Sequence, residues 1–137
     1  MLDINLGGVV NGLRTFVPRM LATGEPHHIL ITASLAGLAT WPGGGPYAAS
    51  KHAVVAVAEQ TALALQETPI NVTVLCPALV RSGMSDVGDD PADIAETALD
   101  AVQHGVFTVV SDDWTSAVAG RGPRLAAGEQ PSLPVPS

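Results

Sequence analysis

Residues 43–54 read GGGPYAASKHAV and contain Tyr47 and Lys51, the only tyrosine and the only lysine of the chain. Pro46 fits the first turn of a helix, where a missing N–H removes no hydrogen bond, so this stretch predicts a helix over residues 47–66. Residues four apart on a helix share a face, with Cβ atoms about 5–6 Å apart. The spacing therefore places the phenol of Tyr47 beside the ammonium of Lys51.

Helices and apolar strands alternate on both sides of this stretch. Residues 2–22 carry apolar side chains at helical spacing, and Asp90, Pro91 and Gly105 mark the start and end of another helix. Three short apolar runs are typical of buried strands: residues 28–34, 71–77 and 106–111. This order predicts an α/β fold with three parallel strands adjacent in chain order, and an active crevice beyond their carboxyl ends.

A nearby cation changes what a tyrosine can do chemically. An isolated phenol is a poor acid or base at neutral pH, whereas a fixed positive charge favours the phenolate. The attraction approaches ~4 kcal/mol at about 4 Å and an effective dielectric constant of about 20, as an upper bound. When such a pair stands alone in a sequence, it is more often a half-exposed tyrosine beside an unrelated, solvated lysine than a catalytic pair. Ser34 favours the catalytic interpretation, because it closes a predicted strand and its hydroxyl can share a substrate oxygen with Tyr47.

Four segments together resemble the short-chain dehydrogenase/reductase family: DINLGG with Asn5, ILITASLAG with Ser34, YAASK at residues 47–51 and CPALVRS at residues 76–82. The Y-x-x-x-K motif alone is weak, but the order and spacing of all four segments are specific, and the resemblance extends over residues 1 to about 111. It implies a Rossmann-type doubly wound parallel sheet, of which this chain supplies about three strands with flanking helices. It also implies hydride transfer between NAD or NADP and a small carbonyl or alcohol substrate.

The resemblance assigns a role to each matching residue. Tyr47 is implied to be the general acid/base, Lys51 to assist it and hold the nicotinamide ribose, and Ser34 to hydrogen-bond the substrate oxygen. Asn5 is implied to anchor a water in the proton relay. The implied cofactor-binding residues are Tyr47, Lys51, Pro77, Ala78, Val80 and Ser82. Two of them depart from the family pattern, since Ala78 replaces the usual glycine and Ser82 the usual threonine.

The glycine-rich turn with which this family binds the cofactor's pyrophosphate is not among the 137 residues, so two interpretations follow. In the first, the sequence is the catalytic half of an NAD(P)-dependent oxidoreductase, read from a late start codon or cut from a longer gene. In the second, it is a catalytically incompetent remnant or an oligomerising interaction module. We expect the isolated chain to bind NAD or NADP weakly or not at all. The resemblance also implies a homo-oligomer built on helices 2–22 and 47–66.

Composition excludes several other classes. A net charge of −7 with six scattered basic residues leaves no patch for nucleic acid. No apolar run reaches bilayer length and no signal pattern opens the sequence, so we expect a cytoplasmic protein without a membrane partner. The histidines lack ligand spacing and Cys76 is the only cysteine, so neither a metal site nor a disulfide is expected.

Two further expectations concern the loops and the tail. Residues 120–137 are rich in proline and glycine without hydrophobic periodicity, which predicts a flexible tail after a folded unit of residues 1–119. Three apolar side chains are candidates for lining a substrate pocket, with ordinary packing as the alternative: Leu38, Trp41 and Met84.

Overall fold

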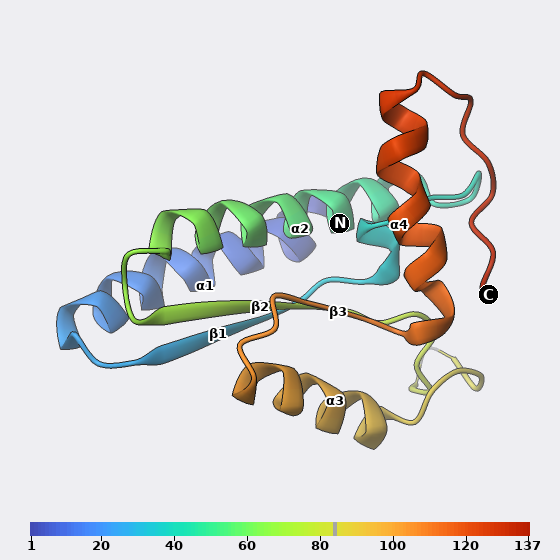
Figure 1. Ribbon diagram of the computed structural model, residues 1–137. Coiled ribbons are helices and arrows are strands. Elements are labelled where there is room, and N and C mark those ends of the chain that lie inside the picture. The colour runs from blue at the N-terminus through green and yellow to red at the C-terminus, as the bar shows by residue number, and fades with distance from the viewer. Residues whose placement is uncertain (84) are drawn as a thin grey trace.

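A computed structural model describes residues 1–83 and 85–137 as a three-layered α/β arrangement. The elements are, in order, α1 (Leu2–Thr23), β1 (His27–Thr32), the 3₁₀ turn η1 (Leu35–Gly37), α2 (Gly45–Leu65), β2 (Ile70–Cys76), α3 (Pro91–Gln103), β3 (Thr108–Val110) and α4 (Asp112–Ala126). Figure 1 shows α1 and α2 on one face of the sheet and α3 on the other. It also shows α4 standing at the end of the sheet toward which the strands point.

The three strands are parallel and adjacent in the order β1-β2-β3, which confirms the predicted topology. In the register of the first pair, His27 lies opposite Ile70 and Thr32 opposite Leu75. Each connection passes through a helix, α2 between the first two strands and α3 between the second and third. Such crossovers bring the carboxyl ends of the strands to one edge, where ligands bind in open α/β sheets.

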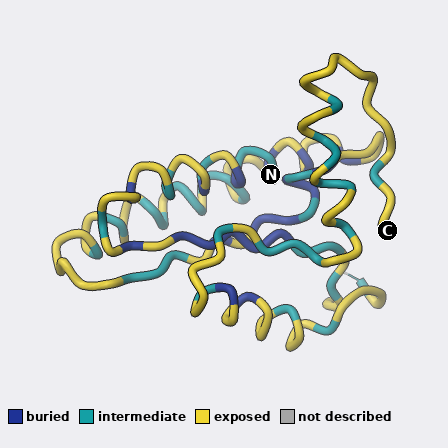
Figure 2. The backbone as a smooth tube through the Cα atoms, viewed as in Figure 1, coloured by how far each residue is buried: buried dark blue, intermediate teal, exposed yellow. Residues whose placement is uncertain are grey.

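The core lies between β2 and the helix α2. Six of the seven residues of β2 are buried, because helices cover both faces of the central strand. Figure 2 shows this buried stretch running along the middle of the sheet. Val54 of α2 and Val74 of β2 are fully buried in the same cluster, which also contains Ile31 of the edge strand β1.

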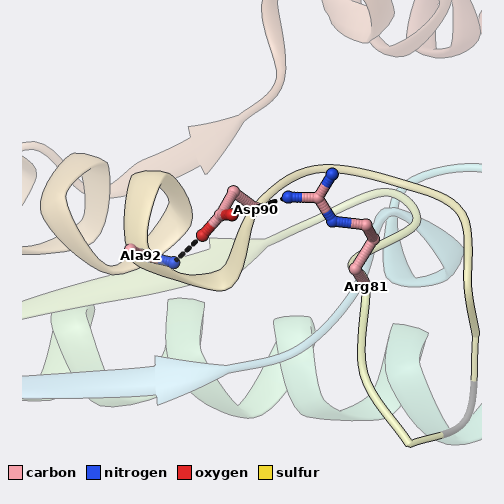
Figure 3. A network of polar contacts seen from close by, with 3 residues as sticks. All are labelled: Arg81, Asp90 and Ala92. Carbon is pink, nitrogen blue, oxygen red and sulfur yellow. Dashed lines mark hydrogen bonds and ion pairs between the residues drawn. The ribbon is translucent and has the colours of Figure 1, made fainter.

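The start of α3 is fixed by Asp90, as the sequence predicted. Its carboxylate accepts a hydrogen bond from the Ala92 N–H at 2.9 Å and pairs with Arg81 at 2.6 Å (Figure 3). The Ala92 N–H, together with Arg81, lowers the pKa of the Asp90 carboxyl. Because the pKa is lowered in the folded chain, the stabilisation is present above the unfolded pKa and is lost as the pH falls through the folded value.

Strand ends differ slightly from the expectation. β1 ends at Thr32 rather than at residue 34, so Ser34 lies in the turn that follows, where it caps η1. β3 comprises only Thr108–Val110 of the predicted run 106–111. Both differences leave the order and direction of the strands unchanged.

The expectation of an unstructured segment from Gly120 onward is wrong for residues 120–126, which complete α4. The predicted boundary between residues 119 and 120 therefore falls inside a helix. Half-buried residues recur at helical spacing along one face: Trp114, Ala117, Val118, Arg121 and Arg124. Asp112 and Asp113 stand in the first turn, where acidic side chains favour a helix. The Gly and Pro content hid this pattern, since Pro123 lies within the helix.

The last residues return along α4 without regular secondary structure. Ser137 donates from its backbone N–H to the Asp113 carbonyl at 2.8 Å, and its hydroxyl donates to the same oxygen at 3.2 Å. In Figure 1 this segment descends beside α4 toward the loop that precedes α2. The tail therefore lies beside the carboxyl ends of the strands.

Candidate active site

Two backbone hydrogen bonds beyond the strand ladder fix Ser34 in place. Ala33 N–H donates to the Leu75 carbonyl and Leu35 N–H to the Pro77 carbonyl, both at 2.8 Å. These bonds continue the β1–β2 pairing past the end of β1 and carry the serine to the carboxyl edge of the sheet. Ser34 is 9% exposed, and its hydroxyl accepts a hydrogen bond from the Ala36 N–H at 3.1 Å. The hydroxyl proton remains free to be donated to a substrate oxygen.

Tyr47 and Lys51 lie in the first turns of α2, as the sequence predicted. The Lys51 Nζ lies 5.8 Å from the centroid of the Tyr47 ring. Among the residues that the structure describes, neither the phenol hydroxyl nor the ammonium has a hydrogen-bond or ion-pair partner. The pair therefore combines a hydroxyl open to a ligand with a cation that retains three unused donors.

Asn5 reaches this helix from α1. Its side-chain N–H donates to the Ser50 hydroxyl at 3.1 Å, and that hydroxyl donates to the Tyr47 carbonyl at 2.7 Å. Ser50 is fully buried, so the chain of bonds lies inside the α1–α2 contact. Sequence reasoning missed Ser50, although a small hydroxyl residue three positions after Tyr47 is a pattern that can bond back to the helix.

Gly37 allows η1 to touch the backbone of α2. A Cβ at this position would lie 2.6 Å from the Lys51 carbonyl oxygen and 2.8 Å from Val55 Cγ2. Only a residue without a side chain permits this approach. The contact sets the distance between the turn that carries Ser34 and the helix that carries Tyr47.

Cys76 lies at the end of β2, behind the serine. It is completely buried, and burial raises the pKa of its thiol to about 11, although a hydrogen bond from the Ser34 backbone N–H acts in the opposite direction. At neutral pH the thiol is therefore protonated, as expected for a small buried core residue.

The segment after β2 is held by a short backbone ladder. Asp89 N–H donates to the Leu79 carbonyl, and Arg81 N–H donates to the Asp89 carbonyl, both at 2.9 Å. Gly88 has a φ of 120°, and a Cβ there would collide with the Leu79 carbonyl. The ion pair between Arg81 and Asp90 closes the same loop (Figure 3). These contacts fix where Ala78 lies relative to the strand end.

A cavity of about 500 Å³ opens at this edge of the sheet and brings together Ser34, Tyr47 and Ala78. Trp41 also lines it, whereas Leu38 packs against the core and Met84 lies outside the described residues. The described lining does not include the other predicted site residues, which are Asn5, Lys51, Pro77, Val80 and Ser82. Asn5 and Lys51 approach Tyr47 from behind, and Ser82 pairs through its backbone with Ser85.

The far wall of the cavity was not predicted. It is formed by Trp114 of α4 and by residues 133–135 of the tail. Trp114 follows the Asp pair that opens α4, and this helix-start pattern could have indicated its element. Residues 133–135 carry no local signal, because their position depends on the fold of the whole tail.

The described part of the chain has neither a cluster of metal-ligand side chains nor a helix that could span a membrane. No group of three or more His, Cys, Asp or Glu side chains is placed there to hold a metal ion. None of the described helices is both long enough and apolar enough to cross a bilayer.

The fold and the Ser34–Tyr47–Lys51 arrangement define one family. The family profile described as short chain dehydrogenase matches residues 1–91, and the chain belongs to this family. It is 40% identical over 86 residues to C alpha-dehydrogenase of Sphingobium sp. strain SYK-6, an alignment that covers 63% of this chain and 28% of the relative. It is 41% identical over 85 residues to 1-deoxy-11-beta-hydroxypentalenate dehydrogenase of Streptomyces avermitilis, covering 62% of this chain and 32% of that one.

Solved structures match over almost the whole chain. A short-chain dehydrogenase from Novosphingobium aromaticivorans superposes with a TM-score of 0.84 at 30% identity, covering 96% of this chain and 50% of the other. A short-chain dehydrogenase/reductase from Burkholderia phymatum, in complex with NAD, also gives 0.84, at 26% identity, and covers 99% of this chain and 61% of the other. The chain thus spans less than two thirds of these relatives.

Gly37→Ala tests whether the close approach of η1 to α2 sets the site. The added methyl meets the Lys51 carbonyl at 2.6 Å, so we expect a loss of stability of about 1–3 kcal/mol from overpacking. Gly7→Ala is the matched control, because nothing lies within 4 Å of a Cβ at that helical position. It should stabilise the chain by about 0.5–1 kcal/mol. Urea unfolding measures both changes, and equal stabilities for Gly37→Ala and wild type would contradict the assigned contact.

Proposed function

We propose that this chain forms the catalytic half of an NAD(P)-dependent short-chain dehydrogenase/reductase that interconverts a carbonyl and an alcohol. The observation that carries the proposal is that Ser34 and Tyr47 line one cavity, with the Lys51 ammonium 5.8 Å from the centroid of the Tyr47 ring. Two hydroxyl-bearing residues at one cavity suit a single substrate oxygen, and family membership supports the reaction class.

Each residue has a part in moving one proton. In the reductive direction, Tyr47 donates its hydroxyl proton to the carbonyl oxygen while the carbonyl carbon gains a hydride. Ser34 donates a hydrogen bond to the same oxygen and stabilises the charge that develops on it. Lys51 stabilises the phenolate that remains on Tyr47. In the oxidative direction the phenolate removes the proton from the alcohol, and the hydride leaves the same carbon.

Asn5 acts through other groups. Through Ser50 it positions the first turn of α2, and its amide is proposed to hold a water that returns a proton to Tyr47. Because its contact is with Ser50, Asn5 is a residue that positions Tyr47.

The residues present fit one end of a dinucleotide. The Lys51 ammonium, which no described residue engages in a hydrogen bond or ion pair, suits the ribose hydroxyls of NAD or NADP, and Ala78 lines the cavity where the nicotinamide would approach Tyr47. Pro77, Val80 and Ser82 belong to the same loop and are proposed to hold the carboxamide. When bound, the nicotinamide supplies or accepts the hydride. The 137 residues contain no unit of strand, glycine-rich turn and helix of the kind that holds a pyrophosphate. The contacts to the pyrophosphate of the cofactor therefore have to come from elsewhere.

The alternative is that these 137 residues act without catalysis, as an incompetent fragment or an oligomerising module. The observation that favours it is the coverage: the chain matches only 28% of one curated relative and 32% of another. The experiments below separate the two.

Tyr47→Phe tests the proton donor. We would join these residues to the half of the Novosphingobium aromaticivorans dehydrogenase that they do not cover and measure NAD(P)H turnover. Removing the hydroxyl should lower kcat by about 10²-fold or more, because general acid–base catalysis contributes that much. Lys51→Met should lower kcat and also raise KM for the cofactor.

Thr15→Val is the control in the same chimera, because among the described residues its hydroxyl bonds to the Asn11 carbonyl alone, on the exposed side of α1. It should leave turnover unchanged. If Tyr47→Phe retained turnover comparable with the control, Tyr47 would not be the proton donor.

Calorimetric titration of the unmodified 137-residue chain tests whether its cofactor site is incomplete. We expect little or no heat of binding with NAD(H) or NADP(H), because the pyrophosphate contacts are missing. Micromolar affinity would show that the chain alone forms a sufficient site, and the assignment of an incomplete half would be wrong.

We also propose that the chain assembles as a homo-oligomer through the outer faces of α1 and α2. Large apolar side chains are exposed on these helices, among them Ile4 at 78% and Leu63 at 68%. Light scattering should therefore give a mass above 14.0 kDa. Ile4→Glu combined with Leu63→Glu should shift the mass toward the monomer, and a monomeric wild-type chain at high concentration would contradict the proposal.

A further inference from the structure

The aromatic side chains of this protein are few and unevenly placed. The sequence has two Trp, one Tyr and two Phe, and both Trp residues and the Tyr line the same cavity of about 500 Å³. Trp41 comes from the loop before α2, and Trp114 from the first turn of α4, much further along the chain. The fold therefore gathers the rings from separate elements around the catalytic hydroxyls.

The rest of the lining is apolar and uncharged. Among the described lining residues none carries a charge, and the catalytic hydroxyls of Ser34 and Tyr47 are its main polar groups. Leu79 is 62% exposed, Leu133 66% and Val135 67%, and all three border the cavity. Apolar side chains exposed around a concave site are typical of a surface that a ligand covers.

The cations around this cavity lie outside its described lining, and one of them is Lys51, whose ammonium lies 5.8 Å from the centroid of the Tyr47 ring. Arg121 and Arg124 line a separate hollow that shares only Ala39 and Pro134 with the cavity. The Arg124 guanidinium also packs over Gly120, 2.6 Å from the position of an added Cβ. A carboxylate placed between the two indoles, away from Lys51, would therefore lose water without a charged side chain in the described lining to replace it, which is unfavourable.

We propose that this cavity selects an uncharged substrate whose carbonyl or carbinol carbon carries an aromatic ring, with the ring lodged between Trp41 and Trp114 and covered by residues 133–135 of the tail. The inference rests on the proposed function in taking the Ser34 and Tyr47 hydroxyls as the groups that meet the substrate oxygen. Aromatic rings favour offset or edge-to-face contact with the two indoles beyond the burial of their area. The indoles thus give a preference for a flat ring over a saturated one of similar size.

The two tryptophans allow a direct test on the 137-residue chain without cofactor, because every tryptophan fluorophore lies at the proposed site. We would titrate the chain with three small probes that differ in one feature each: 1-phenylethanol, 1-cyclohexylethanol and mandelate. Saturable fluorescence changes should give an affinity for 1-phenylethanol about two- to tenfold above that for 1-cyclohexylethanol. Mandelate, which adds a carboxylate to the phenyl alcohol, should bind at least about tenfold more weakly than 1-phenylethanol.

Single substitutions assign the preference to the indoles. Trp114→Leu and Trp41→Leu each leave the other tryptophan as the reporter, and each should reduce the preference for the phenyl over the cyclohexyl probe. Phe16→Leu is the matched control, since this exposed ring lies in the groove between α1 and β1 and should leave all three affinities unchanged.

Three results would overturn the inference: equal affinity for the phenyl and cyclohexyl probes, mandelate binding as tightly as 1-phenylethanol, or no saturable response to any probe. Failure of the proposed function has a different signature. The probes would then bind with the expected selectivity, while the chimera would show no turnover that depends on Tyr47.

Discussion

The close contact between Gly37 and the backbone of α2 at Lys51 is the constraint on which the site depends. It joins the turn after β1 to the helix that follows, at a separation that no side chain would allow. The turn is itself tied to β2 through the Leu35–Pro77 hydrogen bond, so strand end, turn and helix form one rigid unit. Ser34 and Tyr47, which are separated in sequence by a whole loop, thereby line the same cavity.

Most of the fold could be predicted because its signals are local. The apolar runs of the strands, the Asp90 cap and the Pro46 start are each visible within a few residues, and the alternation of elements determines the parallel order. α4 was missed because Gly120, Gly122 and Pro123 suggested a disordered segment, whereas Trp114 and the half-buried residues after it already follow a helical period. The composition of the segment was given more weight than its periodicity.

The candidate site likewise has a part that local sequence could predict and a part that it could not. Ser34, Tyr47 and Lys51 come from two short, adjacent segments, so sequence spacing alone could suggest that they converge. Ser50 escaped notice because its value lies in a contact with Asn5 on another helix. The wall formed by Trp114 and residues 133–135 depends on how the tail returns along α4, which is a tertiary property without a local pattern. The sequence therefore suggested the groups proposed to transfer the proton but not the surface proposed to select the substrate.

These two parts of the site support each other physically. The Lys51 ammonium lies 5.8 Å from the centroid of the Tyr47 ring, and surrounding water weakens an electrostatic effect over such a distance severalfold. An apolar substrate body that fills the space between the indoles would displace that water from the phenol and from the Ser34 hydroxyl. Under the proposed function, their electrostatic effect on the substrate oxygen would then become stronger. A charged ligand would bring its own hydration into the cavity and reduce this effect, so the apolar wall contributes to the chemistry as well as to recognition.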